Sequence, residues 1–267
     1  MNAFHSLWTK PAHGKSPEEF EILTMVLSAL KWREKNGKIT MVTDSDGARL
    51  LEQRGLCTVW DDIKTTLDDI PDYADPDRFW AAGKIYALRG FDAPVVSIDT
   101  DFIVWEPLEL EKTTSGLIVI HRETLRPEVY PNTAEYADYD DGFSWTVLPA
   151  NTAFVYFGRN DLISLYTAYA DGFIKTCRSG GRLCPMVFAE QRLLSMTAHK
   201  MGIKIDSFSS LESLMNGKDN RFTHLWGYKR TLRSCGEEKS GMEARLRSRI
   251  MKDFPQMSDK MNSQIKG

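Results

Sequence analysis

The sequence lacks the long apolar runs and the cysteine patterns that mark several large classes of protein. No apolar run approaches the roughly 20 residues that a membrane-spanning helix needs. The first eight residues lack the basic and apolar regions of a signal peptide. The four cysteines are scattered, with no Cys-x-x-Cys pair, which predicts free thiols and neither a disulfide framework nor a zinc site. These absences predict a cytoplasmic protein without a transmembrane segment.

An excess of charge of one sign is also missing. The 34 basic and 37 acidic residues give a net charge of −3, so no overall field predicts nucleic acid as a partner. An apolar fraction of 42% and an aromatic fraction of 11% are instead typical of a globular protein with a sizeable core. We find no internal repeat.

Strand-length apolar segments alternate with segments of helical periodicity along most of the chain. A helix start with a serine cap is predicted at Ser16-Pro17-Glu18-Glu19. The alternation predicts one α/β domain over residues 1–233, with a mixed, mainly parallel twisted sheet flanked by helices. Residues 234–267 predict a polar, basic helical tail. This tail is expected to be solvated or loosely docked, and weak contact with an acidic membrane surface is the alternative.

Two carboxylates one residue apart, Asp99 and Asp101, follow an apolar run rich in β-branched residues. Ionised carboxylates beside a buried strand repel each other and lose hydration, so they need a compensating charge. Hard oxygen ligands suit Mg²⁺ or Mn²⁺, and such an ion could bind a phosphate-bearing substrate. The alternative is a strand end whose acids cap a helix or face water.

Other candidates stand where neighbouring strands are expected to end, and ligands of parallel sheets bind outside the carboxyl ends of the strands. Asp44 could accept a hydrogen bond from a base or ribose, or could simply cap the next helix. His5 could line the same pocket, or could be a core histidine. Lys84 and Arg78 lie on a helix expected over residues 78–89, and either could reach a diphosphate or be solvated.

Residues 127–143 form a long, proline-broken stretch with several tyrosines and aspartates. Such side chains suit sugars, because rings stack on C–H faces while carboxylates accept O–H bonds. An ordinary solvated loop is the alternative. The glycine pair at 180–181 is too short to predict a phosphate-binding loop.

Four groups of residues, spread over about residues 3–229, together resemble one family. The pattern is similar to that of GT-A-type nucleotide-diphospho-sugar glycosyltransferases, nearest to the glycogenin-like and galactosyltransferase-like groups. The residues that carry the resemblance are Lys84 before Asp99-Thr100-Asp101, Asn151 at the start of an apolar strand, the pair Glu190-Gln191 on a helix, and His224-x-x-Gly227-x-Lys229. The spacing from Gly227 to Lys229 is one residue shorter than in the family, and Thr152-Ala153 replaces its more usual pair.

The resemblance implies a GT-A-like fold and a metal-dependent glycosyltransferase. The enzyme would move a sugar from a nucleotide-diphosphate donor to a hydroxyl of a carbohydrate or other acceptor, as in the synthesis of surface polysaccharides. The implied roles are Mn²⁺ or Mg²⁺ binding by Asp99, Asp101 and His224, donor binding by Lys84, Asp99 and Lys229, and catalysis by Glu190 and Asn151. His5 and Asp44 are added as candidates for donor binding because of their places at strand ends. Whether Glu190 acts as a base or beside the anomeric carbon stays open.

Two other functions fit parts of the pattern. A haloacid-dehalogenase-type phosphatase also has a strand that ends in D-x-D, with Asp99 as the nucleophile and Mg²⁺ beside it. That motif usually opens its fold, whereas three βα units are expected before it here. A non-catalytic sugar-binding member of the GT-A fold is the third hypothesis, because fold does not imply function.

Overall fold

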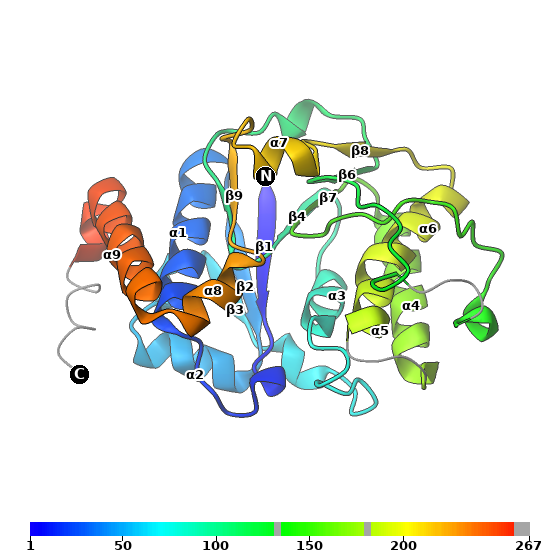
Figure 1. Ribbon diagram of the computed structural model, residues 1–267, viewed down its shortest axis with the longest axis horizontal. Coiled ribbons are helices and arrows are strands. Elements are labelled where there is room, and N and C mark those ends of the chain that lie inside the picture. The colour runs from blue at the N-terminus through cyan, green and yellow to red at the C-terminus, as the bar shows by residue number, and fades with distance from the viewer. Residues whose placement is uncertain (131–134, 179–182, 259–267) are drawn as a thin grey trace.

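The computed structural model describes residues 1–130, 135–178 and 183–258 (Figure 1). Its centre is a seven-stranded sheet in the order β3-β2-β1-β4-β7-β6-β8, and a second, two-stranded sheet pairs β5 with β9. In the larger sheet β7 runs antiparallel to both of its neighbours, and the other four pairs are parallel. The structure therefore confirms the predicted α/β fold with a mixed, mainly parallel sheet.

The strands are β1 (Asn2–Leu7), β2 (Ile39–Thr43), β3 (Asp62–Lys64), β4 (Val95–Ile98), β5 (Phe102–Val104), β6 (Leu117–Val119), β7 (Phe154–Phe157), β8 (Ile205–Ser207) and β9 (Phe222–His224). The α-helices are α1 (Glu19–Lys35), α2 (Ser45–Gln53), α3 (Ala82–Leu88), α4 (Asn160–Thr176), α5 (Leu183–Val187), α6 (Leu193–Lys200), α7 (Leu211–Met215), α8 (Tyr228–Ser234) and α9 (Gly236–Asp253).

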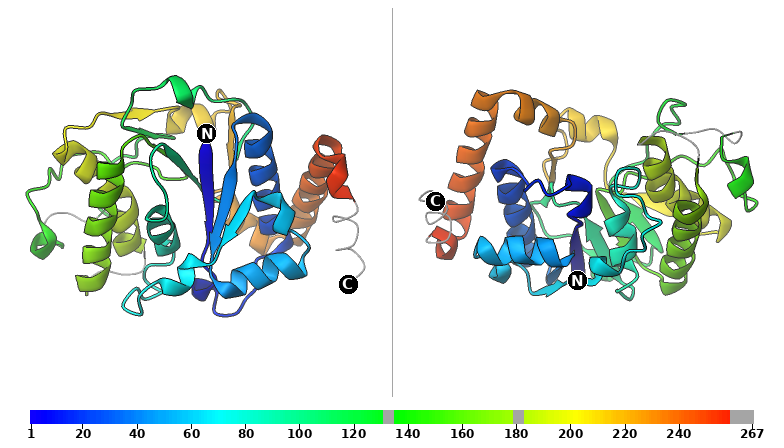
Figure 2. Two further views of the ribbon diagram at one scale, coloured as in Figure 1. Left: turned by 180° about the vertical axis from the view of Figure 1, so that it is seen from behind. Right: turned by 90° about the horizontal axis from the view of Figure 1, so that it is seen from below.

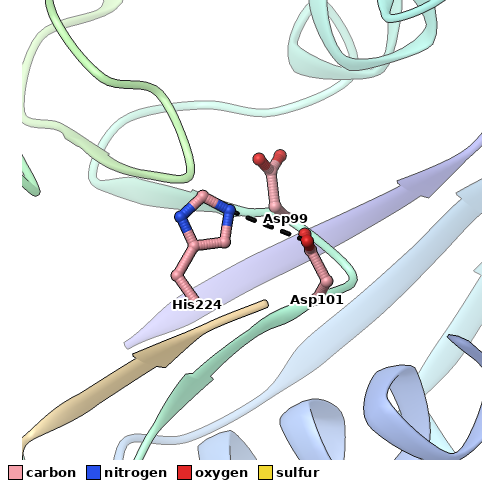
Figure 3. Close-up of side chains that lie close together, drawn as sticks. All are labelled: Asp99, Asp101 and His224. Carbon is pink, nitrogen blue, oxygen red and sulfur yellow. Dashed lines mark ion pairs between the residues drawn. The ribbon is translucent and has the colours of Figure 1, made fainter. Parts of the chain in front are cut away.

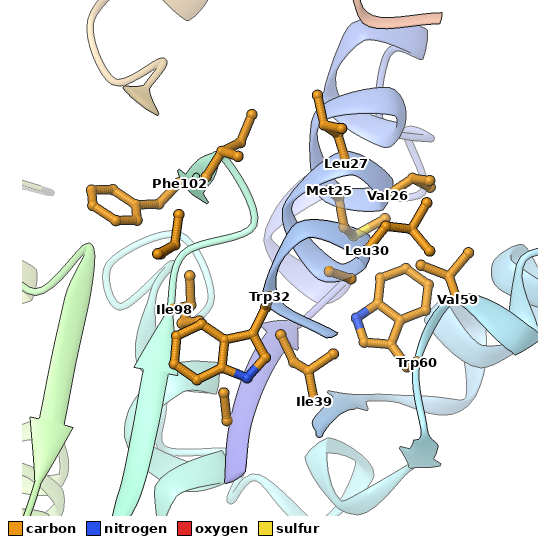
Figure 4. Close-up of a cluster of buried hydrophobic side chains, with 14 of the residues drawn as sticks. Met25, Val26, Leu27, Leu30, Trp32, Ile39, Val59, Trp60, Ile98 and Phe102 are labelled. Carbon is orange, nitrogen blue, oxygen red and sulfur yellow. The ribbon is translucent and has the colours of Figure 1, made fainter. Parts of the chain in front are cut away.

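The sheet carries a hydrophobic core on each face. Successive side chains of a strand point to opposite faces, so Ala3 and Val96 pack on the side of α1, while Phe4 and Val95 pack on the side of α3, α4 and α6. Figures 1 and 2 show these two groups of helices on opposite sides of β1. Figure 4 shows the first core, where Trp32 and other α1 side chains meet the sheet. Helices on both faces leave the strand ends free to form a site.

Helix α9 lies beside α1 (Figures 1 and 2). Leu246 and Ile250 on α9 are buried in the first core. Lys31 on α1 lies 2.6 Å from Asp253, so an ion pair adds to the apolar contact. The helix that was expected to be solvated or loosely docked is thus packed against α1. Within the described residues, none of the helices combines the length and the apolar character needed to cross a membrane.

Two local expectations were wrong. The predicted cap Ser16 does not begin the helix; Glu18 is the N-cap of α1, in a reciprocal capping box with Glu21. The alternation of strand and helix patterns also predicts a strand at Thr58-Val59-Trp60, and these residues do not form one. Val59 and Trp60 lie in a turn, and their side chains are buried in the first core. The strand that pairs with β2, β3, begins only at Asp62.

Candidate metal and substrate cleft

The two-stranded sheet brings His224 beside the paired carboxylates. β5 follows Asp101 directly, β9 ends at His224, and their antiparallel register places Phe102 opposite His224. The backbone N–H of Leu225 donates to the carbonyl of Asp101 at 3.2 Å, which fixes the turn after β9. Asp99 follows β4, so the short connection between β4 and β5 and the end of β9 bring three side chains together (Figure 3).

The ligand atoms of Asp99, Asp101 and His224 all lie within 4.8 Å of one another. His224 Nε2 is 3.7 Å from Asp101 Oδ2 (Figure 3). Ligands on adjacent corners of a six-coordinate ion, each about 2.1 Å from it, lie about 3 Å apart, so small side-chain movements would let all three reach one ion. Two carboxylates suit Mn²⁺ or Mg²⁺, and the imidazole favours the transition metal Mn²⁺, so these residues fit such an ion.

Lysine ammonium groups compensate the charge of both carboxylates. Lys229 Nζ lies 2.8 Å from Asp101 Oδ2, and Lys84 Nζ lies 2.5 Å from Asp99 Oδ1. Burial alone would raise the pKa of Asp101, but the charge of Lys229 and its hydrogen bond outweigh burial and hold that pKa below its usual value. Burial lowers the pKa of His224, so its ring is neutral at pH 7, the form that binds metals.

Lys84 joins the carboxylate cluster to Glu190. Its ammonium also pairs with Glu190 and donates to the carbonyl of Thr152 at 3.0 Å. Thr152 Oγ1 donates to Glu190 Oε1 at 2.8 Å. Burial would lower the pKa of Lys84, but the charges of Asp99 and Glu190 outweigh it and raise that pKa above its usual value. All three ammonium protons therefore have acceptors, and Lys84 connects the half-buried Asp99 to the buried Glu190.

Glu190 lies in a five-residue π-helical segment, Phe188–Arg192, between α5 and α6. The widened turn is typical of functional sites, where it re-aims side chains from a helix. Glu190 is buried, and its backbone carbonyl accepts from the hydroxyl of Tyr166 at 3.0 Å. The sequence placed Glu190 on an ordinary helix, and no periodicity signal identified this segment.

These residues line a cleft of about 1040 Å³. Its floor contains Asp99, Asp101, His224, Lys84 and Glu190. Its walls come from the end of β1 with the loop that follows, the segment before α3, the start of α1, and α8 with the turn that precedes it. The volume is large enough for a nucleotide-sized ligand, since pockets for small molecules measure about 300–1,000 Å³.

Asn151 also lines this cleft, and its side-chain atoms have protein partners. Its Nδ2 donates to Glu123 Oε1 at 2.9 Å, and its Oδ1 accepts from the N–H of Ala153 at 3.1 Å. Glu123 is itself buried, and no sequence pattern marked it. The amide of Asn151 is therefore held in one orientation at the cleft wall.

Two residues expected at the nucleotide do not line the cleft. His5 is fully buried, with Nε2 3.1 Å from Ser28 Oγ and Nδ1 accepting from Trp60 Nε1 at 3.3 Å. Asp44 accepts from the N–H of Gly47 as the N-cap of α2, and from Thr9. Of the two alternatives offered for each residue, the structure thus shows His5 as a core histidine and Asp44 as a helix cap. Arg78 is also absent from the lining, and its guanidinium lies 3.7 Å from Cys177 Sγ.

The tyrosines of residues 127–143 do not form an exposed sugar platform. Tyr130 and Tyr136 are only 5% and 4% exposed, and Tyr136 packs on Phe173 and Phe188. Residues 131–134 of this stretch and the glycine pair at 180–181 lie outside the described residues.

Sequence reasoning missed several side chains that line the cleft. Trp80 and Trp226 are 40% and 49% exposed there, although tryptophans are usually mostly buried. Arg230 also lines the cleft, one position beyond Lys229. The shortened Gly-to-Lys spacing was the signal that could have pointed to Arg230. No sequence signal marked Trp80, because exposure of one aromatic residue depends on the tertiary structure.

The model of a family described as "Family of unknown function (DUF6734)" matches residues 1–151. No curated protein matches the chain. Three solved structures are similar at low identity. The PaToxG glycosyltransferase is 12% identical, with 81% of this chain and 73% of that chain covered and a TM-score of 0.49. Mouse xyloside xylosyltransferase 1 in its apo form is 10% identical, with 78% of this chain and 85% of that chain covered and a TM-score of 0.43. An active-site mutant of LgtC is 10% identical, with 71% of this chain and 69% of that chain covered and a TM-score of 0.40. Similarities with identities and TM-scores this low do not indicate which reaction this chain catalyses, so the chemistry has to follow from its own residues.

Proposed function

Because this chain belongs to the DUF6734 family, a family of unknown function, we propose its activity from the cleft: a metal-dependent glycosyltransferase with a nucleotide-diphosphate sugar as donor. The observation that carries the proposal is the convergence of Asp99, Asp101 and His224 on the floor of a large cleft. A divalent ion held there would bind a diphosphate, and the cleft has room for the nucleoside and a sugar. The proposed acceptor group is a hydroxyl.

In the proposed reaction, a bond forms between the acceptor oxygen and the anomeric carbon of the donor sugar. The bond between that carbon and the diphosphate oxygen breaks, and the diphosphate leaves with the electron pair. The acceptor proton passes to the leaving diphosphate or to water. The ion, when bound, supplies positive charge beside the oxygen on which negative charge develops.

We assign Asp101, His224 and Asp99 to holding the ion. Asp101 is the most buried of the three at 7% exposure, and Lys229 neutralises it at 2.8 Å when no ion is bound. We propose that Lys229 would give way to the ion, because both would neutralise the Asp101 carboxylate. Asp99 keeps its contact with Lys84 through Oδ1, which leaves its other oxygen for the ion.

We propose that Glu190 stabilises positive charge at the anomeric carbon. Its Oε1 accepts from Lys84 and Thr152, and these contacts hold the carboxylate in place at the cleft floor. A fixed carboxylate beside a carbon that becomes electron-poor lowers the barrier without a change of protonation. We propose that Asn151, whose amide is fixed by Glu123, borders the same reacting carbon.

The charge balance of the cleft points to Arg230 as a further contact for the donor diphosphate. Arg230 is exposed and has no acidic partner among the described residues. Most other basic side chains of the lining already pair with an acid: His13 with Asp77, Lys84 with Asp99 and Glu190, Lys229 with Asp101, and Arg233 with Glu21. A guanidinium without a carboxylate partner is available to a diphosphate.

Calorimetric titration of UDP and GDP, with Mn²⁺ and with EDTA, tests the ion site. We expect binding at least tenfold tighter with Mn²⁺ for at least one nucleotide, and we expect Asp101→Asn to abolish this difference. Asp161→Asn removes an exposed carboxylate outside the cleft and serves as the matched control. Equal affinity with and without the ion for both nucleotides would contradict the proposal.

The same variants test the diphosphate contact and the phosphatase alternative. Arg230→Gln should weaken UDP or GDP binding at least tenfold, whereas Lys38→Gln, an exposed lysine outside the cleft, should not change it. Turnover of p-nitrophenyl phosphate that is lost in Asp99→Asn would favour a haloacid-dehalogenase-type phosphatase. Slow hydrolysis of a UDP- or GDP-sugar, lost in Glu190→Gln, would favour the transferase.

A further inference from the structure

Trp80 presents an indole ring to the cleft. The side chain is 40% exposed and belongs to the segment that leads into α3, the helix of Lys84. The next residue is anchored, because the N–H of Ala81 lies 3.3 Å from Met186 Sδ. The ring therefore projects from a fixed backbone that leads into the helix carrying Lys84. An exposed indole retains apolar area that a ligand can cover.

Two polar side chains of the cleft lining join the same segment to the loop after β1. His13 Nε2 donates to Asp77 Oδ1 at 2.8 Å, and both side chains are more than half exposed. Asp77 lies three residues before Trp80 in the chain. Both groups thus remain accessible for further hydrogen bonds at the edge of the cleft.

The backbone of His13 is strained, with φ of 49° in the left-handed region. The other non-glycine residue with positive φ among the described residues, Trp226, also lines this cleft. Such strain clusters at ligand sites. Its confinement to this cleft is a second observation, independent of the exposed ring, that favours a ligand site here.

An aromatic ring, a carboxylate and an imidazole together are chemically complementary to a pyranose ring. A pyranose has an apolar C–H face that covers an indole, and hydroxyl groups at its edge that donate to a carboxylate or pair with an imidazole. An anionic acceptor fits less well, because Asp77 would repel it. Gln191, next to Glu190, lines the same cleft and adds an amide.

We propose that Trp80, Asp77 and His13 form the subsite for a neutral pyranose ring of the acceptor. This inference rests on the proposed glycosyltransferase function and names its acceptor class. In residues 127–143, where sugar binding was one of two alternatives, Tyr130 and Tyr136 are buried and Tyr139 is half-buried, and we assign that role to Trp80.

Saturation-transfer NMR tests the subsite without the need for turnover. The probes are methyl β-glucoside, methyl β-galactoside, methyl α-mannoside, lactose and maltotriose, each with Mn²⁺ and UDP. We expect saturation of at least one sugar, strongest on the ring C–H protons of one face. Trp80→Ala should reduce that signal at least fivefold, Trp80→Phe should restore most of it, and Asp77→Asn should reduce it.

Tyr73→Ala is the matched control, because Tyr73 is an aromatic residue of similar exposure just upstream that does not line the cleft. Its sugar signal should equal that of the wild type. Absence of saturation for every sugar in the wild type, or equal signals in wild type and Trp80→Ala, overturns the inference. If UDP or GDP still binds with Mn²⁺ in that case, the proposed function stands and the acceptor is a peptide or a lipid. If neither nucleotide binds, the proposed function itself fails.

Discussion

Acid should destabilise this protein through one buried histidine, His5. Trp60 Nε1–H can only donate, so Nδ1 of His5 must accept and the proton must be on Nε2, which donates to Ser28 Oγ. A second proton on the ring would place two N–H groups face to face. Desolvation by burial lowers the pKa of His5 from 6.5 to about 3, although the charge of Asp101 acts in the opposite direction.

The sign and size of the effect follow from linkage. The folded-state pKa is below the unfolded-state value, so the unfolded chain binds the proton first and stability is lost as the pH falls below 6.5. At about 1.4 kcal/mol per pH unit, lowering the pH to 5.0 reduces the free energy of unfolding by about 2 kcal/mol. The stabilisation is fully present above pH 6.5 or so.

Urea unfolding at pH 7.5 and pH 5.0, followed by tryptophan fluorescence, measures this loss. His5→Gln keeps one acceptor and one donor but does not titrate, so its free energy of unfolding should fall by about 2 kcal/mol less than that of the wild type. His199→Gln, which removes an exposed histidine on α6, should behave as the wild type. Parallel losses in wild type and His5→Gln would refute the reasoning, whatever their absolute stabilities.

Two further variants probe the packing that positions the cleft. Lys84→Met leaves the carboxylates of Asp99 and Glu190 without their shared ammonium group. In chemical denaturation, this variant should lower the free energy of unfolding by about 3–5 kcal/mol. Lys84→Arg should recover part of this loss. In Gly83→Ala the new Cβ would lie 2.7 Å from Trp8 Cβ, so thermal and urea unfolding should show a loss of about 1–3 kcal/mol; Gly236→Ala meets open space and should change stability by less than about 0.5 kcal/mol.

The sequence alone was sufficient for the architecture because the decisive signals are local. Alternating strand and helix patterns predicted the α/β fold, and the apolar run before Asp99 predicted the buried strand β4. The two carboxylates that follow that strand, Asp99 and Asp101, can be recognised from Ile98 and the three residues after it. The cap role of Asp44, one of two alternatives, likewise depends only on the helix that follows it.

Residues far apart in the chain needed the resemblance to a family before they could be considered together. His224 is more than 120 positions from Asp99, and only the pairing of β5 with β9 places its ring beside Asp101. Likewise the contact between Lys84 and Glu190 joins two helical segments 106 positions apart. No local pattern contains such distances.

Burial separated the polar residues that reach the cleft from those that do not. Like Asp99, His5 and Asp44 were expected to reach a ligand at the ends of strands. The ring of His5 is instead hydrogen-bonded to Ser28 and Trp60, and the carboxylate of Asp44 to Thr9 and the start of α2. Trp80 shows the opposite case, an aromatic residue that composition assigns to the core and the fold leaves exposed. Local periodicity therefore determined which elements form, whereas solvent exposure and partner choice, which depend on every element at once, were decided only by the tertiary structure.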